Sequence, residues 1–381
     1  MQFEFATAQR IIFGRGVIQR LPDLVAAYGR KVLLVSGKHS LGFGLTLLHP
    51  NNGRELATII TSGEPDLDFI QSGLAYMSSI KPDVIVSLGG GSTLDTGKAL
   101  AALYTNPGDV LDYVEVVGKG LPLQNDPLPH IAISTTSGTG SEVTRNAVLG
   151  IAAQKAKVSL RSKKMIPTIA LVDPDLNRTL PTDLTAATGL DALTQVIEPL
   201  ISRRANPITD AFCLQAIPLI MQSLPLLMRT PEDMVLREQM SLASLYGGLA
   251  LANSGLGVVH GFAAAIGGMY KDIRHSNICA AVLPAGFKAN RLACQRSTEH
   301  MSIAGRIEAI SLLLTNGNSK YGEEALRELV NRLGCPGLAS LGVKWDDAAE
   351  IIERVAQSSS FRANPVELSQ ETLTAILAES M

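Results

Sequence analysis

Residues 83–101 read DVIVSLGGGSTLDTGKALA, and this stretch decides the fold. The run DVIVSL is short, apolar and rich in β-branched residues, which is typical of a buried parallel strand. Gly89, Gly90 and Gly91 then allow the chain to turn tightly and to approach an anionic ligand without a Cβ atom in the way. A strand that runs directly into such a turn predicts the start of a strand–helix unit.

The helix after the turn is expected to begin at Ser92, which stands at the N-cap position, with Asp95 three residues later as in a capping box. Free N–H groups at a helix N-terminus bind phosphate groups well, so the turn is a candidate pyrophosphate site. The spacing matches neither G-x-G-x-x-G nor a Walker loop, and a simple tight turn remains the alternative.

Further apolar runs predict a doubly wound sheet in the first half of the chain. They are Lys31–Ser36, Ala57–Thr61, His130–Ser134 and Thr168–Val172. Helix-compatible segments lie between them, for example Leu21–Tyr28 and Leu67–Ile80, and Gly or Pro follows each.

The pattern changes near Leu180, after which the chain reads as successive helices over 184–202, 208–228, 232–251 and 255–269. We therefore predict an N-terminal α/β dinucleotide-binding domain over residues 1–177 and an all-α C-terminal domain over residues 178–381.

A second glycine- and hydroxyl-rich loop, ISTTSGTGSEVT, spans residues 133–144 and again follows a predicted strand. Open α/β sheets bind ligands at the carboxyl ends of their strands. The hydroxyls of Thr135, Thr136, Thr139 and Ser141 could donate to a phosphate or to a nicotinamide. Alternatively, they satisfy the backbone of their own loop.

A candidate metal set lies in the helical half. Asp191 and Gln195 are four residues apart and so share one helical face, and His260 and His275 follow in later helices. A carboxylate and two imidazoles bind divalent metals, and the amide oxygen of Gln195 offers a weaker fourth ligand. Histidines satisfied inside an apolar core are the alternative.

Composition excludes several classes of protein. Of the 381 residues, 46% are hydrophobic, and 33 Lys and Arg nearly balance 35 Asp and Glu, which argues against disorder and against nucleic acid as a partner. Ser241–Tyr270 carries no charged residue, yet Asn253, His260 and recurrent glycines favour a buried core over a membrane span. Four scattered cysteines and an N-terminus without a signal-peptide pattern indicate the cytoplasm.

The motifs GGGSTLDTGKALA, TTSGTGSEVT and ATGLDALT, in this order, resemble those of the iron-containing (group III) alcohol dehydrogenase family. The resemblance extends from IIFGRGVIQRLP to ANPVELSQETLTAIL. It implies a dehydroquinate synthase-like fold, an active site in the cleft between the two domains, and commonly a homodimer. It also implies an NAD(P)-dependent alcohol dehydrogenase or aldehyde reductase that uses Fe²⁺ or Zn²⁺ as a Lewis acid on a small alcohol or aldehyde.

Carried over by position, the resemblance assigns cofactor binding to both loops and to a lysine near the nicotinamide ribose: Gly89, Gly90, Gly91, Ser92, Asp95, Thr135, Thr136, Thr139, Ser141 and Lys157. It assigns the metal to Asp191, Gln195, His260 and His275.

Two departures from the family pattern bear on mechanism. Gln195 stands where the family has a histidine ligand, and Ala264 stands where many members carry a further histidine. The segment before His275 is one residue longer than usual, which places Arg274 beside the metal position. We hypothesise that Arg274 or Lys157 stabilises the developing alkoxide if metal binding is weak.

Cofactor preference is predicted from Ser36, Gly37 and Lys38. NAD-preferring relatives place an aspartate at the Gly37 position, where it repels a 2′-phosphate. Since Gly37 leaves space and Ser36 and Lys38 can contact a phosphate, we expect NADP(H) to be preferred over NAD(H).

Two alternative functions stay open. One is glycerol dehydrogenase or dehydroquinate synthase chemistry on the same scaffold. The other, motivated by Gln195 and Ala264, is a cofactor-binding protein without turnover.

Overall fold

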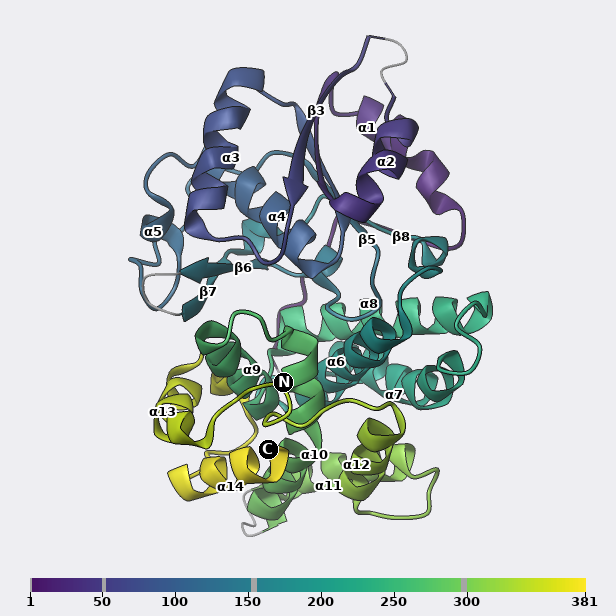
Figure 1. Cartoon of the computed structure of the whole chain (residues 1–381), viewed down its shortest axis with the longest axis vertical. Helices are drawn as coiled ribbons and strands as arrows, with labels where there is room; N and C mark the ends of the chain where they lie inside the picture. The colour runs from purple at the N-terminus through teal and green to yellow at the C-terminus, as the bar shows by residue number, and fades with distance from the viewer. Residues whose placement is uncertain (1, 50–52, 152–155, 296–299) are drawn as a thin grey trace. The chain divides into compact units, whose positions relative to one another are not determined.

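The computed structural model describes residues 2–49, 53–151, 156–295 and 300–381. Its residues form two compact units. The α/β unit contains Ala6–Thr136 and Gly140–Arg178, and the helical unit contains the N-terminal residues through Phe5, the short piece Ser137–Thr139, and Thr179–Met381. In Figure 1 every strand of the described chain lies in the α/β unit.

The α/β unit is built on a six-stranded parallel sheet with strand order β1-β8-β5-β4-β2-β3. In this order the strands are Arg10–Phe13, Ile169–Val172, His130–Ser134, Val84–Gly89, Lys31–Gly37 and Glu55–Thr61. The five predicted strands are thus confirmed. β1 is an edge strand of only four residues, too short for a periodic signal.

Alternate residues of the central strands enter two different cores, as the period of a strand requires. On β2, Leu33 and Val35 face one core, while Val32 and Leu34 face the other. The helices of the unit are α1 (Leu21–Ala26), α2 (Lys38–Leu47), α3 (Leu67–Ile80), α4 (Gly91–Thr105) and α5 (Val110–Tyr113). Because both faces of the sheet are covered, its central strands β8, β5, β4 and β2 are continuously buried, which is why the sequence reveals them.

A two-stranded antiparallel hairpin, β6 (Asn146–Ile151) and β7 (Ala156–Arg161), was not predicted. Buried and half-buried residues alternate along β6, so only every second side chain has to be apolar and the strand gives a weak signal in the sequence. Lys157 lies in β7.

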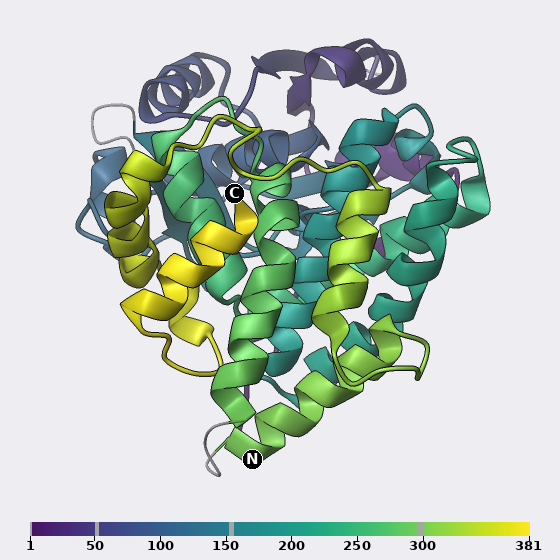
Figure 2. The same cartoon turned by 60° about the horizontal axis from the view of Figure 1, so that its bottom comes forward.

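The helical unit contains nine α-helices in the part of the chain that the structure describes. They are α6 (Thr182–Ile201), α7 (Pro207–Leu227), α8 (Met234–Ser254), α9 (Val258–Met269), α10 (His275–Gln295), α11 (Met301–Leu314), α12 (Gly322–Arg332), α13 (Ala348–Gln357) and α14 (Gln370–Ser380). The prediction of an all-helical second half is confirmed. Figure 2 shows α10 between α12 and α14.

Helix α6 is the central helix of this unit, because every residue from Thr185 to Ile201 is buried. Its apolar side chains pack against α7, α8 and α10. Asp191, Gln195 and Glu198 are therefore polar groups inside an apolar core, and such groups are costly unless something compensates them.

The uncharged stretch 241–270 is divided between two helices, α8 and α9, which meet at an angle of 94°. Of the described helices, α7 is long and apolar enough by composition to cross a membrane. Core helices pass the same test, and α7 buries Cys213, Ile217, Ile220 and Leu224 in the core of the helical unit.

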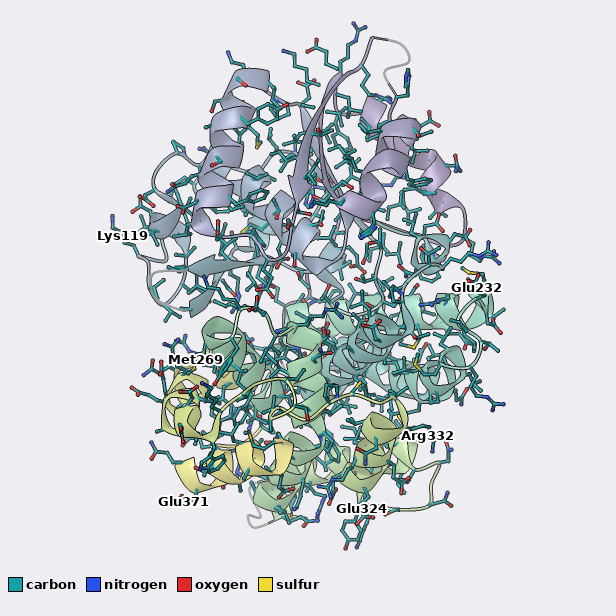
Figure 3. The ribbon with its side chains drawn as sticks, viewed as in Figure 1. Lys119, Glu232, Met269, Glu324, Arg332 and Glu371 are labelled. Carbon is teal, nitrogen blue, oxygen red and sulfur yellow. The ribbon has the colours of Figure 1, made fainter. Side chains whose placement is uncertain are left out.

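The surface carries charges of both signs, as the composition requires. Exposed examples labelled in Figure 3 are Lys119, Glu232, Glu324, Arg332 and Glu371.

Candidate active site

The two glycine- and hydroxyl-rich loops lie next to each other because β4 and β5 are adjacent parallel strands. Gly89 at the end of β4 pairs with Ser134 at the end of β5, and the Thr135 N–H donates to the Gly89 carbonyl at 3.0 Å. A Cβ atom built on Gly90 would lie 3.4 Å from the Thr136 methyl group. The structure thus brings Gly89, Gly90, Thr135 and Thr136 together at the carboxyl edge of the sheet.

The predicted capping box at Ser92 is wrong. Helix α4 begins at Gly91, its N-cap is Gly90, and no side chain caps it. The chain enters the helix earlier because the Gly90 carbonyl already accepts from the N–H groups of Thr93 and Leu94. An N-terminus without a side-chain cap keeps its backbone donors for an anionic ligand.

Asp95 and Ser141, both assigned to the cofactor, instead bond to each other. The Ser141 hydroxyl donates to Asp95 Oδ1 at 2.7 Å, and Asp95 Oδ2 accepts from the Val148 N–H. The fully buried Lys98 donates to Ser141 and Thr144 and lies 3.0 Å from Asp95. These hydrogen bonds connect α4 to the loop of residues 133–144 and to β6, and so hold the candidate nucleotide site in one conformation.

Burial also shifts the ionisation of groups around this network. It lowers the pKa of Lys98 in spite of the opposing charge of Asp95. It raises the pKa of Glu142 to about 7, although Glu142's own backbone N–H and the Lys98 charge act in the opposite direction. Desolvation thus dominates at both groups.

The residues predicted to select the cofactor differ in accessibility. Ser36 is completely buried, and its hydroxyl donates to the carbonyls of Leu88 and Gly37. Ser36 is therefore committed to the backbone in this structure and does not reach a phosphate. Lys38 is exposed in the first turn of α2, whose N-cap, Gly37, has no side-chain cap.

Lys157 and Thr139, which are also assigned to the nucleotide, belong to different units. The Lys157 ammonium forms an ion pair with Glu64 at 2.7 Å. Thr139 belongs to the short piece Ser137–Thr139 that is grouped with the helical unit. Within that unit the Ser137 and Ser241 hydroxyls lie 3.1 Å apart.

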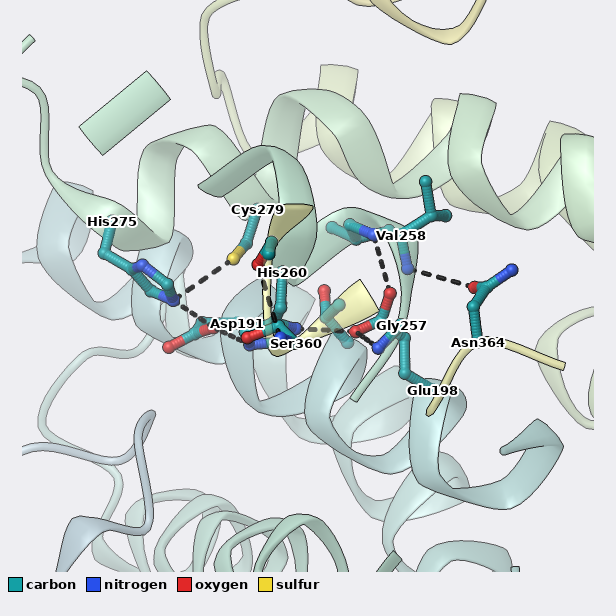
Figure 4. Close-up of polar contacts among 12 residues, drawn as sticks. Asp191, Glu198, Gly257, Val258, His260, His275, Cys279, Ser360 and Asn364 are labelled. Atoms are coloured by element: carbon teal, nitrogen blue, oxygen red, sulfur yellow. Dashed lines mark hydrogen bonds and ion pairs between the residues drawn. The ribbon is translucent and has the colours of Figure 1, made fainter. Parts of the chain in front are cut away.

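Three of the four predicted metal ligands, Asp191, His260 and His275, converge inside the helical unit (Figure 4). Asp191 comes from the middle of α6, His260 from the first turn of α9, and His275 is the first residue of α10. Asp191 Oδ1 lies 3.4 Å from His260 Nε2 and 3.9 Å from His275 Nε2. Asp191 and His260 are buried, whereas the His275 side chain is 36% exposed, so one side of the cluster is accessible.

Glu198, which the sequence analysis overlooked, holds His260 in place. Its carboxylate accepts from the N–H groups of Gly257 and Val259 at the start of α9 and lies 2.7 Å from His260 Nδ1. Nε2 of His260 is thereby directed toward Asp191. A side chain at position 257 would collide with Glu198 and Asn364, which explains the glycine there.

Replacing Glu198 by alanine is expected to lower the free energy of unfolding by about 3–5 kcal/mol. The substitution leaves two buried N–H groups and His260 without their acceptor. Urea unfolding monitored by circular dichroism measures the change. Glu308→Ala, at an exposed position on α11, is the control and should change stability by less than about 0.5 kcal/mol. Equal stability of the two variants would contradict the anchoring role.

Cys279 is the second residue that the sequence analysis overlooked. It is buried one turn after His275 on α10, and its Sγ lies 3.6 Å from His275 Nε2. The donor atoms of Asp191, His260, His275 and Cys279 all lie within 4.8 Å of one another. The signal was present in the sequence as a His-x₃-Cys spacing, which places both side chains on one helical face.

The ionisation of the cluster reflects competition between burial and charge. Burial disfavours a charged Asp191, but the contact with His260 and the charges of both histidines outweigh it and hold the pKa of Asp191 below its ordinary value. Burial also opposes protonation of His260, whereas Cys279, Asp191 and Glu198 together hold its pKa well above normal. Burial raises the pKa of the Cys279 thiol to about 12.

The cluster fits a divalent cation. Apart from the ion pairs of Asp191 with His260 and His275, the carboxylate oxygens of Asp191 and Oε1 of Gln195 are buried without a hydrogen-bond partner among the described residues. Buried oxygens of this kind are unfavourable unless a positive charge compensates them. Arg274 does not supply it: its side chain is 57% exposed and pairs with Asp183 at 3.2 Å.

A strand–glycine–helix loop in a parallel sheet and a carboxylate–imidazole cluster in a helical unit together define a dehydrogenase with the dehydroquinate synthase-like fold. Family models match both parts of the chain: iron-containing alcohol dehydrogenase over residues 8–174, and the C-terminal part of the Fe-containing alcohol dehydrogenase family over residues 185–381. The chain belongs to the iron-containing alcohol dehydrogenase family. It is an oxidoreductase that acts on CH–OH groups with a nicotinamide cofactor.

Curated relatives align over nearly the whole chain. An NAD-dependent methanol dehydrogenase of Bacillus methanolicus is 34% identical over 363 residues, which cover 93% of each chain. A 1,3-propanediol dehydrogenase of Klebsiella pneumoniae is 35% identical and covers 94% of this chain and 95% of its own.

Solved structures agree with these relatives. A 1,3-propanediol oxidoreductase superposes with a TM-score of 0.89 at 31% identity, and an alcohol dehydrogenase from Oenococcus oeni with 0.90 at 29%. Each covers 100% of both chains.

Proposed function

We propose that this chain reduces a small aldehyde to its alcohol, with the nicotinamide nucleotide bound by the α/β unit and a divalent metal bound by the helical unit. The observation that carries the metal proposal is the convergence of the buried Asp191 and His260 with the partly exposed His275. The names of the relatives, a methanol and a 1,3-propanediol dehydrogenase, support a short alcohol or aldehyde as substrate.

The metal, when bound, supplies Lewis acidity that polarises the carbonyl while the nicotinamide donates hydride. Asp191 contributes the negative charge that attracts the cation. Glu198 orients His260 through Nδ1 and so presents Nε2 as a donor. Gln195 and Cys279 each offer a fourth donor atom. Arg274 pairs with Asp183, and Lys157 pairs with Glu64. We therefore propose that the metal, rather than either of these cations, stabilises the charge of the developing alkoxide.

For the nucleotide we propose that the N-terminus of α4, with Gly89, Gly90, Gly91 and Ser92, receives the pyrophosphate. Thr135, Thr136 and Thr139 are proposed to line the nicotinamide side. Asp95 and Ser141 act through the network that holds the loops. The enzyme is proposed to be a cytoplasmic homodimer, which agrees with its four free cysteines as far as the compartment is concerned.

A titration with NADPH and NADH, followed by nucleotide oxidation with a panel of short aldehydes, tests this function. We expect binding of at least one nucleotide, aldehyde-dependent oxidation, and loss of activity after chelation that added Zn²⁺ or Fe²⁺ restores. Nucleotide binding without turnover for any aldehyde would favour the cofactor-binding alternative. Full activity in a metal-free sample would remove the Lewis acid from the mechanism.

We also propose that NADPH is preferred, because Gly37 provides no carboxylate and the exposed Lys38 stands at the N-terminus of α2. Lys38→Ala is expected to lower the ratio of kcat/KM for NADPH over NADH by about fivefold, since it removes one exposed charge contact. The exposed Lys119→Ala serves as the control and should leave the ratio unchanged. A clear preference for NADH in the unmodified enzyme would refute this proposal.

A further inference from the structure

Cys279 is buried in the core of the helical unit and also faces the predicted metal ligands. It lies on α10 four residues after His275, and its thiol is directed toward the same point as the His275 ring (Figure 4). Around it stand Asp191 and His260, which come from two other helices. Cys279 therefore packs in the core and also offers a sulfur donor to this cluster.

The distances within this cluster match those of a tetrahedral metal site. With bonds of about 2.1 Å to nitrogen or oxygen and about 2.3 Å to sulfur, neighbouring donors of a tetrahedral zinc site lie about 3.4–3.6 Å apart. The pair His260 Nε2 and Asp191 Oδ1 is separated by 3.4 Å, and the pair His275 Nε2 and Cys279 Sγ by 3.6 Å. The third pair, His275 Nε2 and Asp191 Oδ1, is separated by 3.9 Å. The other three pairs of donor atoms are separated by no more than 4.8 Å.

Charge also favours the sulfur over the amide of Gln195. A thiolate brings a negative charge into direct contact with the cation, whereas the amide of Gln195 is neutral and the buried Glu198 carboxylate reaches the site only through His260 Nδ1, at 2.7 Å. Thiolate is the softer donor and favours Zn²⁺ over the oxygen-preferring metals.

We propose that the metal of this chain is held by Asp191, His260, His275 and the thiolate of Cys279, so that Cys279 replaces the imidazole that Gln195 does not provide. The inference rests on the proposed function in that it concerns the metal of the same site. On binding, the S–H bond of Cys279 breaks, its sulfur electron pair forms the bond to the metal, and the proton leaves to solvent with no change of oxidation state. Zinc accepts a fifth ligand, so four protein donors are compatible with catalysis.

Cobalt substitution tests the proposal, because a thiolate bound to Co²⁺ produces an intense charge-transfer band in the near-ultraviolet that nitrogen and oxygen donors lack. We expect the band in the full chain loaded with one Co²⁺, and its loss in Cys279→Ala. Since even outer partners of metal ligands contribute ten- to hundredfold to affinity, Cys279→Ala should raise the Kd for Zn²⁺ at least about a hundredfold.

Two matched variants test whether the loss of the band and of metal affinity is specific to Cys279. Cys294→Ala removes another buried cysteine from the same helix and should keep both the band and the affinity. Gln195→Ala should also keep the band. Loss of metal in Gln195→Ala with an unaltered Cys279→Ala would overturn the assignment of Cys279 and leave the metal-dependent function standing. If the unmodified chain binds neither Co²⁺ nor Zn²⁺, the inference and the metal part of the proposed function both fall.

Discussion

Asp191→Asn is expected to lower kcat/KM for aldehyde reduction by about a thousandfold, as the loss of several kcal/mol of Lewis-acid stabilisation implies. The asparagine has the same shape but no charge, so the buried cluster loses the group that attracts a cation. Both kcat/KM and the metal content, measured on one preparation of the purified variant, should decrease.

The stability of the metal-free variant distinguishes this effect from misfolding. Asp191 Oδ1 lies 3.4 Å from His260 Nε2, and the histidines hold the pKa of Asp191 below its ordinary value, so the neutral amide should lower Tm of the metal-free chain modestly while the chain still folds. Asp183→Asn provides the control, because Asp183 is an exposed carboxylate on the same helix that pairs with Arg274. It should retain activity to within about twofold. Normal metal content and activity in Asp191→Asn would contradict the proposed centre.

Gly90→Val is expected to weaken nucleotide binding by about ten- to hundredfold, which corresponds to about 1.4–2.8 kcal/mol. Gly90 has φ −78° and ψ −175°, which side-chain-bearing residues adopt without strain, so the effect should not arise from the backbone. The added side chain instead lies beside Thr136, whose methyl carbon is 3.4 Å from the Cβ position, between the two loops where the phosphates are proposed to lie. Titration of protein fluorescence with NADPH or NADH measures the change.

Gly305→Val is the matched control, because a Cβ atom at this exposed position of α11 meets nothing within 4 Å. It should bind the nucleotide like the unmodified chain. Asp191→Asn should also retain nucleotide affinity, while Gly90→Val retains its metal. If Gly90→Val bound both nucleotides normally, the pyrophosphate site would have to be sought elsewhere.

Strands with continuous apolar or β-branched runs could be predicted from the sequence, including β3, of which only Thr61 is buried. Strands such as β4 are buried along their whole length and appear as uninterrupted apolar runs. The hairpin of β6 and β7 is buried only at alternate positions, and β1 is four residues long, so neither carries a comparable signal. The division of the chain into two domains, residues 1–177 and 178–381, stays a prediction.

The sequence predicted those residues of the candidate site that are polar and stand in otherwise apolar helices. Asp191, His260 and His275 were identified in this way, and the structure brings them together. Glu198 was overlooked although Asp191, Gln195 and Glu198 follow an i, i+4, i+7 pattern on a helix that is buried on all sides. The roles assigned to Asp95, Ser36 and Ser141 could not be judged from sequence, because their partners depend on strand order and loop packing.

The cluster draws its donors from three helices that are far apart in the sequence, and a cation bound there would act as a cross-link between α6, α9 and α10. A ligand that binds only the folded chain adds about 2.7 kcal/mol to its stability when present at a hundred times its Kd. Heat resistance of this enzyme would then depend on metal supply. A cell short of the metal would hold a protein that is not only less active but also less durable.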